Sequence, residues 1–192
     1  MNNADMQSTG FELDLGWRDR IKDFDYGVHL LLSDDRQKIL KYPNTTGKIA
    51  TWYVSKYNGD IWGFETIGIT KSQEEMDAHL ASLPNGGQDA LGVKWGAGDI
   101  MYRDLNGDGK ISDGATLNDP GDKKVIGNTS PRFRFGLDLN ASWKGFDVRL
   151  FFQGVAKRDA WLNDNMFWGA TGGIWQSACF TSHLDFFREE GD

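Results

Sequence analysis

The sequence predicts an all-β protein whose antiparallel strands, about four of them, belong to a large transmembrane β-barrel with long extracellular loops and one short helix. Three observations predict this fold. Four segments alternate between apolar and polar residues over strand-like lengths. Short connections alternate with very long ones, and aromatic residues stand beside the short connections.

The first hairpin is expected within residues 1–32. Residues 10–18 place Phe11, Leu13, Leu15 and Trp17 on one face, with polar residues or glycine between them. After a polar link of about five residues, 19–23, residues 24–32 repeat the pattern from Phe24 to Leu32. Alternation with a period of two over this length is a strong strand signal.

The second hairpin is expected within residues 131–155. Residues 132–143 alternate from Phe133 to Trp143, and a two-residue turn, Lys144-Gly145, leads into a fourth alternating segment that begins at Phe146. The faces predicted to meet lipid carry Phe11, Leu13, Leu15, Phe135, Leu137, Val148 and Leu150, while the polar faces would line the lumen.

The lengths of the connections favour a barrel. Residues 33–130 separate the hairpins, whereas compact soluble domains seldom carry structureless connections longer than about 12–15 residues. Trp17, Phe24, Trp143 and Phe146 lie beside the short turns, where outer-membrane barrels carry an aromatic girdle. Alternation alone is equally compatible with a soluble sandwich whose apolar faces point inward.

The long connection carries a short helix of its own. Ser72 and Glu75 form a capping box, Met76 and Leu80 follow on one face, and Pro84 with the glycines after it ends the helix near residue 82. Residues 48–57 would extend a strand or form an extra hairpin.

The stretch DLNGDGKISD resembles a calcium-binding loop. Hard cations prefer six to eight oxygen ligands, and a sharp turn at Gly109 would gather them. The expected ligands are Asp104, Asn106, Asp108 and the carbonyl of Lys110. Ala115 occupies the twelfth position, where an EF-hand needs glutamate, so the missing carboxylate must come from Asp113, Asp119 or Asp122. The alternative is a turn rich in Asp and Asn that binds no metal.

Composition narrows the remaining functions. A net charge of −7 disfavours binding to nucleic acid. The single cysteine, Cys179, cannot form an intramolecular disulfide or a cysteine-rich metal site. The three histidines are scattered and no catalytic motif is present, so we expect no enzyme. The first ten residues lack the features of a signal peptide.

Two stretches, GDIMYRDLNGDGKISDG and DPGDKKVIGNTSPRFRFGLDLNASWKGFDVRLFFQG, resemble the C-terminal part of TonB-dependent outer-membrane receptors of the SusC/RagA type. TGFELDLGWRDRIKDFDYGV looks like the hairpin that precedes this block in that family, and the similarity covers residues from about Ser8 to Val155. The resemblance implies that Asp122 closes the acidic loop, here across a longer insert.

The resemblance also implies a cellular location and a function. Members of the family look like closed, plugged barrels in the outer-membrane lipid that import oligosaccharides or peptides, with a SusD-like lipoprotein as lid and TonB as the driver. Four strands cannot close a barrel, and no plug or TonB box is found in the sequence. We therefore interpret the chain as a receptor fragment that transports nothing by itself.

The tail, residues 156–192, is rich in aromatic residues and is interpreted as a truncated extracellular loop. Trp161, Trp168 and Trp175 are candidates for stacking against a sugar, or for packing the loop against its neighbours. A rival function is a soluble calcium-dependent carbohydrate-binding β module. Such a module would fold as a monomer in buffer, whereas open membrane strands would aggregate through their edges.

Overall fold

A computed structural model of the chain describes residues 3–162, 181 and 185. It is an antiparallel β structure with one short helix among the described residues, which confirms the predicted fold class. The elements are β1 (Asp5–Ile21), β2 (Phe24–Lys41), β3 (Asp60–Phe64), β4 (Thr66–Ile69), α1 (Gln73–Ala81), β5 (Ile100–Tyr102), β6 (Lys123–Asn128), β7 (Arg132–Trp143) and β8 (Phe146–Lys157). The chain divides into two compact units.

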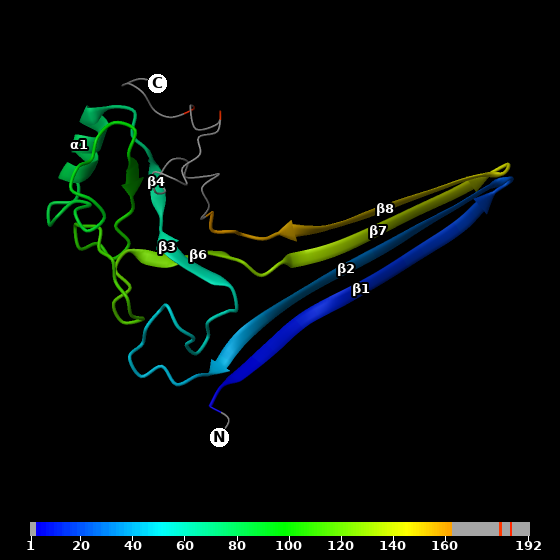
Figure 1. Ribbon diagram of the computed structural model, residues 1–192, viewed down its shortest axis with the longest axis horizontal. Coiled ribbons are helices and arrows are strands. Elements are labelled where there is room, and N and C mark those ends of the chain that lie inside the picture. The colour runs from blue at the N-terminus through cyan, green and yellow to red at the C-terminus, as the bar shows by residue number, and fades with distance from the viewer. Residues whose placement is uncertain (1–2, 163–180, 182–184, 186–192) are drawn as a thin grey trace, which may run out of the picture. The chain divides into compact units, whose positions relative to one another are not determined.

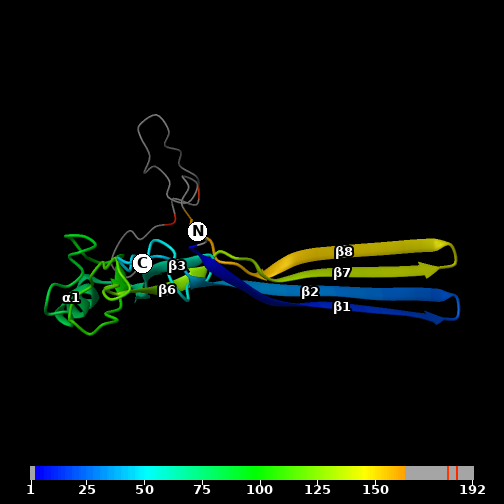
Figure 2. The same ribbon diagram turned by 90° about the horizontal axis from the view of Figure 1, so that it is seen from below.

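The first unit is built on a four-stranded antiparallel sheet in the order β1-β2-β7-β8. The turns within its two hairpins lie at the same end of the sheet (Figures 1 and 2). Lys144 and Gly145 form the predicted two-residue turn with φ angles of +48° and +89°. Positive φ at both central residues suits the right-handed twist of the flanking strands.

The first hairpin differs from the prediction in its turn and in its length. Ile21 pairs with Phe24, so the turn consists of Lys22 and Asp23 alone instead of about five residues. The residues assigned to the link continue the strand, where Arg20 lies 3.4 Å from Asp25 in an ion pair. Beyond the apolar segment, polar residues extend β1 back to Asp5 and β2 on to Lys41, because the backbone ladder needs no apolar face to continue.

The expected strand or hairpin at residues 48–57 is wrong. Within the first unit, residues 55–58 instead run beside the end of β2: Asn58 N–H donates to the Gln37 carbonyl at 2.9 Å, and Ser55 N–H donates to that of Ile39 at 2.8 Å. Only a single bridge, Lys38 to Tyr57, forms there. Tyr53 packs inward, 9% exposed, which anchors this segment without a regular strand.

The second unit holds the helix and the acidic loop around a small core of Ile49, Met76, Leu83 and Ile111. Ser72 caps α1 as predicted, with its Oγ accepting from Glu75 N–H at 3.1 Å. The Glu75 carboxylate accepts from Lys71 N–H at 2.8 Å, one residue before the cap, so the capping box is closed from the neighbouring residue. Met76 is fully buried and fixes the helix to the unit.

Among the described residues, the one helix present has neither the length nor the apolar character to cross a membrane.

Candidate functional site

One face of the four-stranded sheet is apolar across all four strands. The pairing aligns residues in rows such as Trp17–Val28–Leu139–Leu150 and Leu15–Leu30–Leu137–Phe152. Trp17 is 63% exposed and Phe146 74% exposed, which is far from the burial of a soluble core. Phe11, Leu13, Leu15, Phe135, Val148 and Leu150, all predicted to face lipid, are exposed on this face, and Leu137 is half-buried.

The apolar face has the dimensions of a membrane band. On β1 it runs from Phe11 to Ile21, interrupted by Asp19, whose carboxylate accepts from the Tyr26 hydroxyl at 3.4 Å. These ten steps of ~3.3 Å are about 25 Å across a bilayer at a strand tilt of ~40°. Its lower edge is a row that crosses the sheet as Ile21–Phe24–Trp143–Phe146. Three aromatic residues in that row agree with the girdle predicted beside the short turns.

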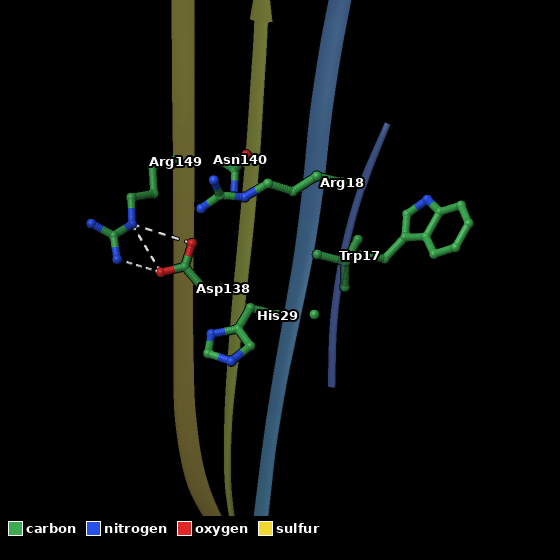
Figure 3. A pocket seen from close by; sticks show the side chains of 8 residues that line it. Trp17, Arg18, His29, Asp138, Asn140 and Arg149 are labelled. Carbon is green, nitrogen blue, oxygen red and sulfur yellow. Dashed lines mark hydrogen bonds and ion pairs between the residues drawn. The ribbon is translucent and has the colours of Figure 1, made fainter. Parts of the chain in front are cut away.

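The opposite face of the sheet is mainly polar and carries a hollow at its middle. Figure 3 shows Arg18, His29, Asp138, Asn140 and Arg149 on this side of the strands, while Trp17 points to the other side. The Asp138 carboxylate accepts from Arg149 Nε at 2.9 and 3.2 Å.

A second charged contact joins β1 to β2 on the same polar face. His29 Nε2 lies 2.6 Å from an oxygen of Asp14, and Asp138 stands opposite His29 in the register. These groups lie side by side across all four strands. Such a face suits water or a polar partner and not lipid.

The acidic loop of the second unit has the tight turn that the sequence predicts. Gly109 has a φ angle of +78°, which favours glycine. The two oxygens of Asp104 accept from Gly107 N–H at 2.6 Å and from Gly109 N–H at 2.8 Å. Asn106 accepts from Asp108 N–H at 2.8 Å, so consecutive side chains hold the backbone in a coil.

Asp122 reaches back into this loop. Its side chain is fully buried, with one oxygen accepting from Leu105 N–H at 2.7 Å and the other from Ser112 N–H at 2.7 Å. Carboxylate oxygens of Asp104, Asp108 and Asp122 lie within 4.8 Å of one another. The sequence left Asp113, Asp119 and Asp122 as candidates for the closing carboxylate, and the structure places Asp122 in that position.

The insert before Asp122 is a closed excursion. Asp113 and Gly121 form an antiparallel bridge, and Asp122 N–H donates to the Ser112 carbonyl at 3.0 Å, so the chain returns to where it left. Gly121 has a φ angle of +60°, and a Cβ there would collide with the Ser112 carbonyl oxygen. The length of the insert therefore does not separate Asp122 from the loop.

The other predicted ligands, Asp113 and Lys110, are not among the three clustered carboxylates. Asp113 forms an ion pair with Lys123 and is outside the group of three carboxylates. The Lys110 N–H donates to Asp108 at 3.1 Å, and Ile111 is buried as an anchor of the loop. Burial raises the pKa of Asp104, but hydrogen bonds from Gly109 and Gly107 outweigh that effect and the pKa is lowered below its ordinary value.

One of the three predicted sugar-binding tryptophans can be placed. Trp161 is 62% exposed, and its ring lies near Gly63, where a Cβ would be 3.9 Å from Cζ3. Trp168 and Trp175 lie outside the described residues, as do Cys179 and most of the predicted tail loop.

Two features of these surfaces were missed by sequence reasoning. One is the closed excursion of residues 113–121. The other is a contact of Arg36 and Lys38 with Tyr57. The alternation of apolar residues stops before Arg36, so it carried no signal there.

Comparison with known proteins supports one class of protein. No family model matches the chain. Over 157 residues, 79% of the chain, it is 24% identical to a protein named TonB-dependent receptor P3 from Formosa agariphila. The chain spans about 15% of that protein's length. This similarity supports a relation to TonB-dependent receptors in general.

Proposed function

We propose that this chain forms part of the barrel wall of a TonB-dependent receptor of the SusC/RagA type in the outer membrane. The complete receptor would import oligosaccharides or peptides, with a SusD-like lipoprotein at the cell surface and TonB as the source of force. The observation that carries the proposal is the two-faced sheet, apolar toward one side and polar toward the other across all four strands. The proposal gives the chain no catalytic role.

Two further features support this assignment. Both short turns lie at one end of the sheet, and the long connection between Lys41 and Arg132 leaves from the other end, as in outer-membrane barrels. The similarity to TonB-dependent receptor P3 points to the same class. The SusC/RagA subtype, the lid lipoprotein and the substrate class are proposed because the stretches around the acidic loop resemble that family.

A fluorescence experiment tests the membrane orientation. Two variants would each carry a single tryptophan. One keeps Trp17 on the apolar face, and the other carries His29→Trp on the polar face. Both would be reconstituted in phosphatidylcholine vesicles with brominated acyl chains. We expect strong quenching of Trp17 and weak quenching of the tryptophan at position 29. Equal quenching of the two would overturn the assignment of the faces.

The genomic neighbourhood tests the wider receptor. Sequencing the DNA on both sides of the reading frame should show in-frame plug and barrel segments, and a gene for a SusD-like lipoprotein nearby. An unrelated neighbourhood with clean stop codons would contradict the import function and leave only a shared ancestry for the strands.

We also propose that the acidic loop binds a structural calcium ion through Asp104, Asp108 and Asp122, with Asn106 and the Lys110 carbonyl as further oxygen ligands. Support comes from the three carboxylates within 4.8 Å of one another and from the burial of Asp122. The ion would stiffen a loop at the cell surface.

Asp108→Asn tests the calcium proposal, with Asp113→Asn as its matched control because Asp113 forms an ion pair with Lys123. Calorimetric titration should show a calcium affinity at least tenfold weaker for Asp108→Asn and little changed for Asp113→Asn. Unchanged affinity and unchanged resistance of the loop to protease in Asp108→Asn would contradict the proposal.

The rival function, a soluble calcium-dependent carbohydrate-binding module, is less favoured. It would share the acidic loop and the exposed Trp161, but it would need to cover the apolar face of the sheet. Side chains such as Trp17 and Phe146 are instead largely exposed. Stable monomers in detergent-free buffer would favour this rival.

A further inference from the structure

Two cations lie directly beyond the apolar band on β2. Arg36 and Lys38 follow Leu32 at even spacing in an unbroken ladder, so they point to the same side of the sheet as the apolar face. Neither forms an ion pair with a carboxylate in the part of the chain that the structure describes. Asp34, between Leu32 and Arg36, is already paired with Arg132. The charge of Asp34 also acts on Arg36, but no direct ion pair among the described residues neutralises Arg36 or Lys38 at this edge of the apolar face.

An aromatic ring holds the two cations together. The guanidinium carbon of Arg36 lies 4.3 Å from the centroid of the Tyr57 ring, and Nζ of Lys38 lies 5.8 Å from it. Backbone hydrogen bonds fix this ring beside β2: Asn58 N–H donates to the Gln37 carbonyl and Ile39 N–H to the Lys56 carbonyl, both at 2.9 Å. We call Arg36, Lys38 and Tyr57 the basic cluster.

The nearby Lys56 contacts residues of its own segment and is not part of the basic cluster. Its Nζ donates to the Thr51 carbonyl at 2.9 Å and lies 5.3 Å from the Tyr53 ring. Burial lowers the pKa of Lys56, with the charge of Asp60 acting in the opposite direction. Lys56 is thus engaged with its own segment, and the charges open to a ligand are those of the basic cluster.

The backbone of Arg36 lies at the height of the headgroup layer, and that of Lys38 lies just beyond it. From the Phe11–Asp34 row, which ends the apolar band, Arg36 and Lys38 lie about 7 and 13 Å along the strand, or roughly 5 and 10 Å along the bilayer normal at a ~40° tilt. Each headgroup region is about 5–8 Å thick. The long side chains of arginine and lysine can adjust their charged ends within this layer.

We propose that the basic cluster binds the phosphate group of an anionic membrane lipid. The inference rests on the proposed function, since it requires the apolar face to meet lipid. Arginine presents a planar fork of N–H donors that matches two phosphate oxygens, and lysine adds a point charge. The lipid source is favoured over a free phosphate because the site continues the apolar face, where the acyl chains of the same lipid would lie.

Binding to vesicles of two compositions tests this site. The full chain would be bound to vesicles of phosphatidylcholine alone and to vesicles that also contain phosphatidic acid. The test variant is Arg36→Gln/Lys38→Gln, and the control is Lys71→Gln/Lys94→Gln, which removes equal charge from exposed positions of the second unit. We expect the gain in binding from phosphatidic acid to fall about 25-fold in the test variant, because each of the two basic residues near an anionic surface contributes roughly fivefold. The control should keep most of the gain.

The outcomes separate this site from the proposed function. Binding of every variant to phosphatidylcholine alone reports on the apolar face, so a failure there would count against the membrane assignment as a whole. If both double variants lose the gain equally, the attraction is general charge and the basic cluster is not a site. If millimolar inorganic phosphate abolishes the gain in the unmodified chain, the cluster recognises free phosphate and the lipid assignment is overturned. Tyr57→Leu removes the ring but no charge. Its gain in binding from phosphatidic acid should be several-fold smaller than that of the unmodified chain.

Discussion

At the scale of single residues, Asp122 is the side chain on which the acidic loop depends most. It is fully buried, and its two oxygens accept hydrogen bonds from two separate segments of the loop, at Leu105 and at Ser112. We expect Asp122→Asn to destabilise the loop by about 1–3 kcal/mol even without calcium, because an amide NH₂ would face a backbone N–H.

Amide hydrogen exchange at Leu105 and Ser112 measures this effect, which should appear as faster exchange at both positions. Asp119→Asn is the matched control, because Asp119 is exposed. Equal protection in Asp122→Asn and the unmodified chain would show that the carboxylate does not hold the loop.

The lowered pKa of Asp104 predicts how the stability of the loop changes at acidic pH. Burial raises its pKa, hydrogen bonds from Gly109 and Gly107 lower it more strongly, and the result lies below the ordinary value of 3.8. A carboxylate with a lowered folded pKa stabilises the folded state above the unfolded pKa and loses that effect as the pH falls through the folded pKa.

The amide resonances of Gly107 and Gly109 report on this titration. We expect them to shift with a midpoint below the ordinary aspartate value of 3.8. In Asp104→Asn this pH-dependent shift of the two amide resonances should disappear. A midpoint above the ordinary value would contradict the role of the two hydrogen bonds.

The sequence predicted half of this acidic loop. Asp104, Asn106, Asp108 and Gly109 lie within six residues, so local spacing was enough to predict the turn and its oxygen donors. The return of Asp122 depends on the bridge between Asp113 and Gly121 and on a close backbone approach at Gly121. Such contacts arise from the path of the excursion, which residue spacing does not encode.

At the scale of elements, glycine and phenylalanine form a cross-strand pair on β7 and β8. Gly154 is the register partner of Phe135, and a Cβ on Gly154 would lie 2.8 Å from Cζ of that ring. The ring therefore covers the glycine, and Gly154→Ala would force it away.

We expect Gly154→Ala to lower the stability of the sheet by about 1 kcal/mol, as the pair is lost. Gly136→Ala is the matched control, since a Cβ there meets Leu31 and Phe151 at an ordinary 3.8 Å. It should gain about 0.5 kcal/mol from reduced freedom of the unfolded chain. The variants are compared by their urea unfolding midpoints in one detergent. An equal shift of the midpoint in both variants would contradict the packing of the Phe135 ring over Gly154.

Two neighbouring leucines on β2 test the assignment of the faces. Leu30 belongs to the apolar row with Leu15 and Leu137, whereas Leu31 belongs to the opposite face, with Asp14 and Gly136 as its partners. A lysine on the lipid side near the bilayer centre costs about 2–4 kcal/mol, and a lysine on the lumen side costs little.

We therefore expect Leu30→Lys to weaken partition into phosphatidylcholine vesicles by a factor of about 30 or more, and Leu31→Lys to leave it nearly unchanged. Both variants add the same charge to adjacent positions. A larger loss for Leu31→Lys would reverse the two faces.

The strands were predictable where both faces differ in polarity. From Phe24 to Leu32 and from Arg134 to Trp143 the segments are strands with the expected sides. At Phe133, whose φ angle is +53°, the alternation is interrupted, and Arg132 pairs with Asp34 on the apolar side instead of the expected polar side. Beyond Leu32 the residues of β2 are mostly polar on both faces, so periodicity carries no signal. Backbone pairing with residues 5–12 continues the strand, and residues 55–58 add backbone hydrogen bonds to its end. The same loss of signal hid the basic cluster.

At the scale of the whole chain, the four-stranded sheet has two edges, on β1 and on β8, that are unpaired among the described residues. Three antiparallel pairings lie between them, so β1 and β8 run in opposite directions. The β8 edge of one copy can therefore pair antiparallel with the β1 edge of the next, in a head-to-tail contact. Exposed edges together with an apolar face favour association over a monomeric state.

This geometry predicts different behaviour in two solvents. In detergent-free buffer we expect the chain to form large aggregates, because both the edges and the apolar face are exposed to water. In detergent micelles the face is covered and the edges alone remain, so discrete oligomers should form instead. Sedimentation velocity in a density-matched detergent distinguishes these states. A monomer in plain buffer would favour the soluble carbohydrate-binding module. A monomer confined to detergent would mean that the edges are covered within the chain itself, while the face still needs lipid.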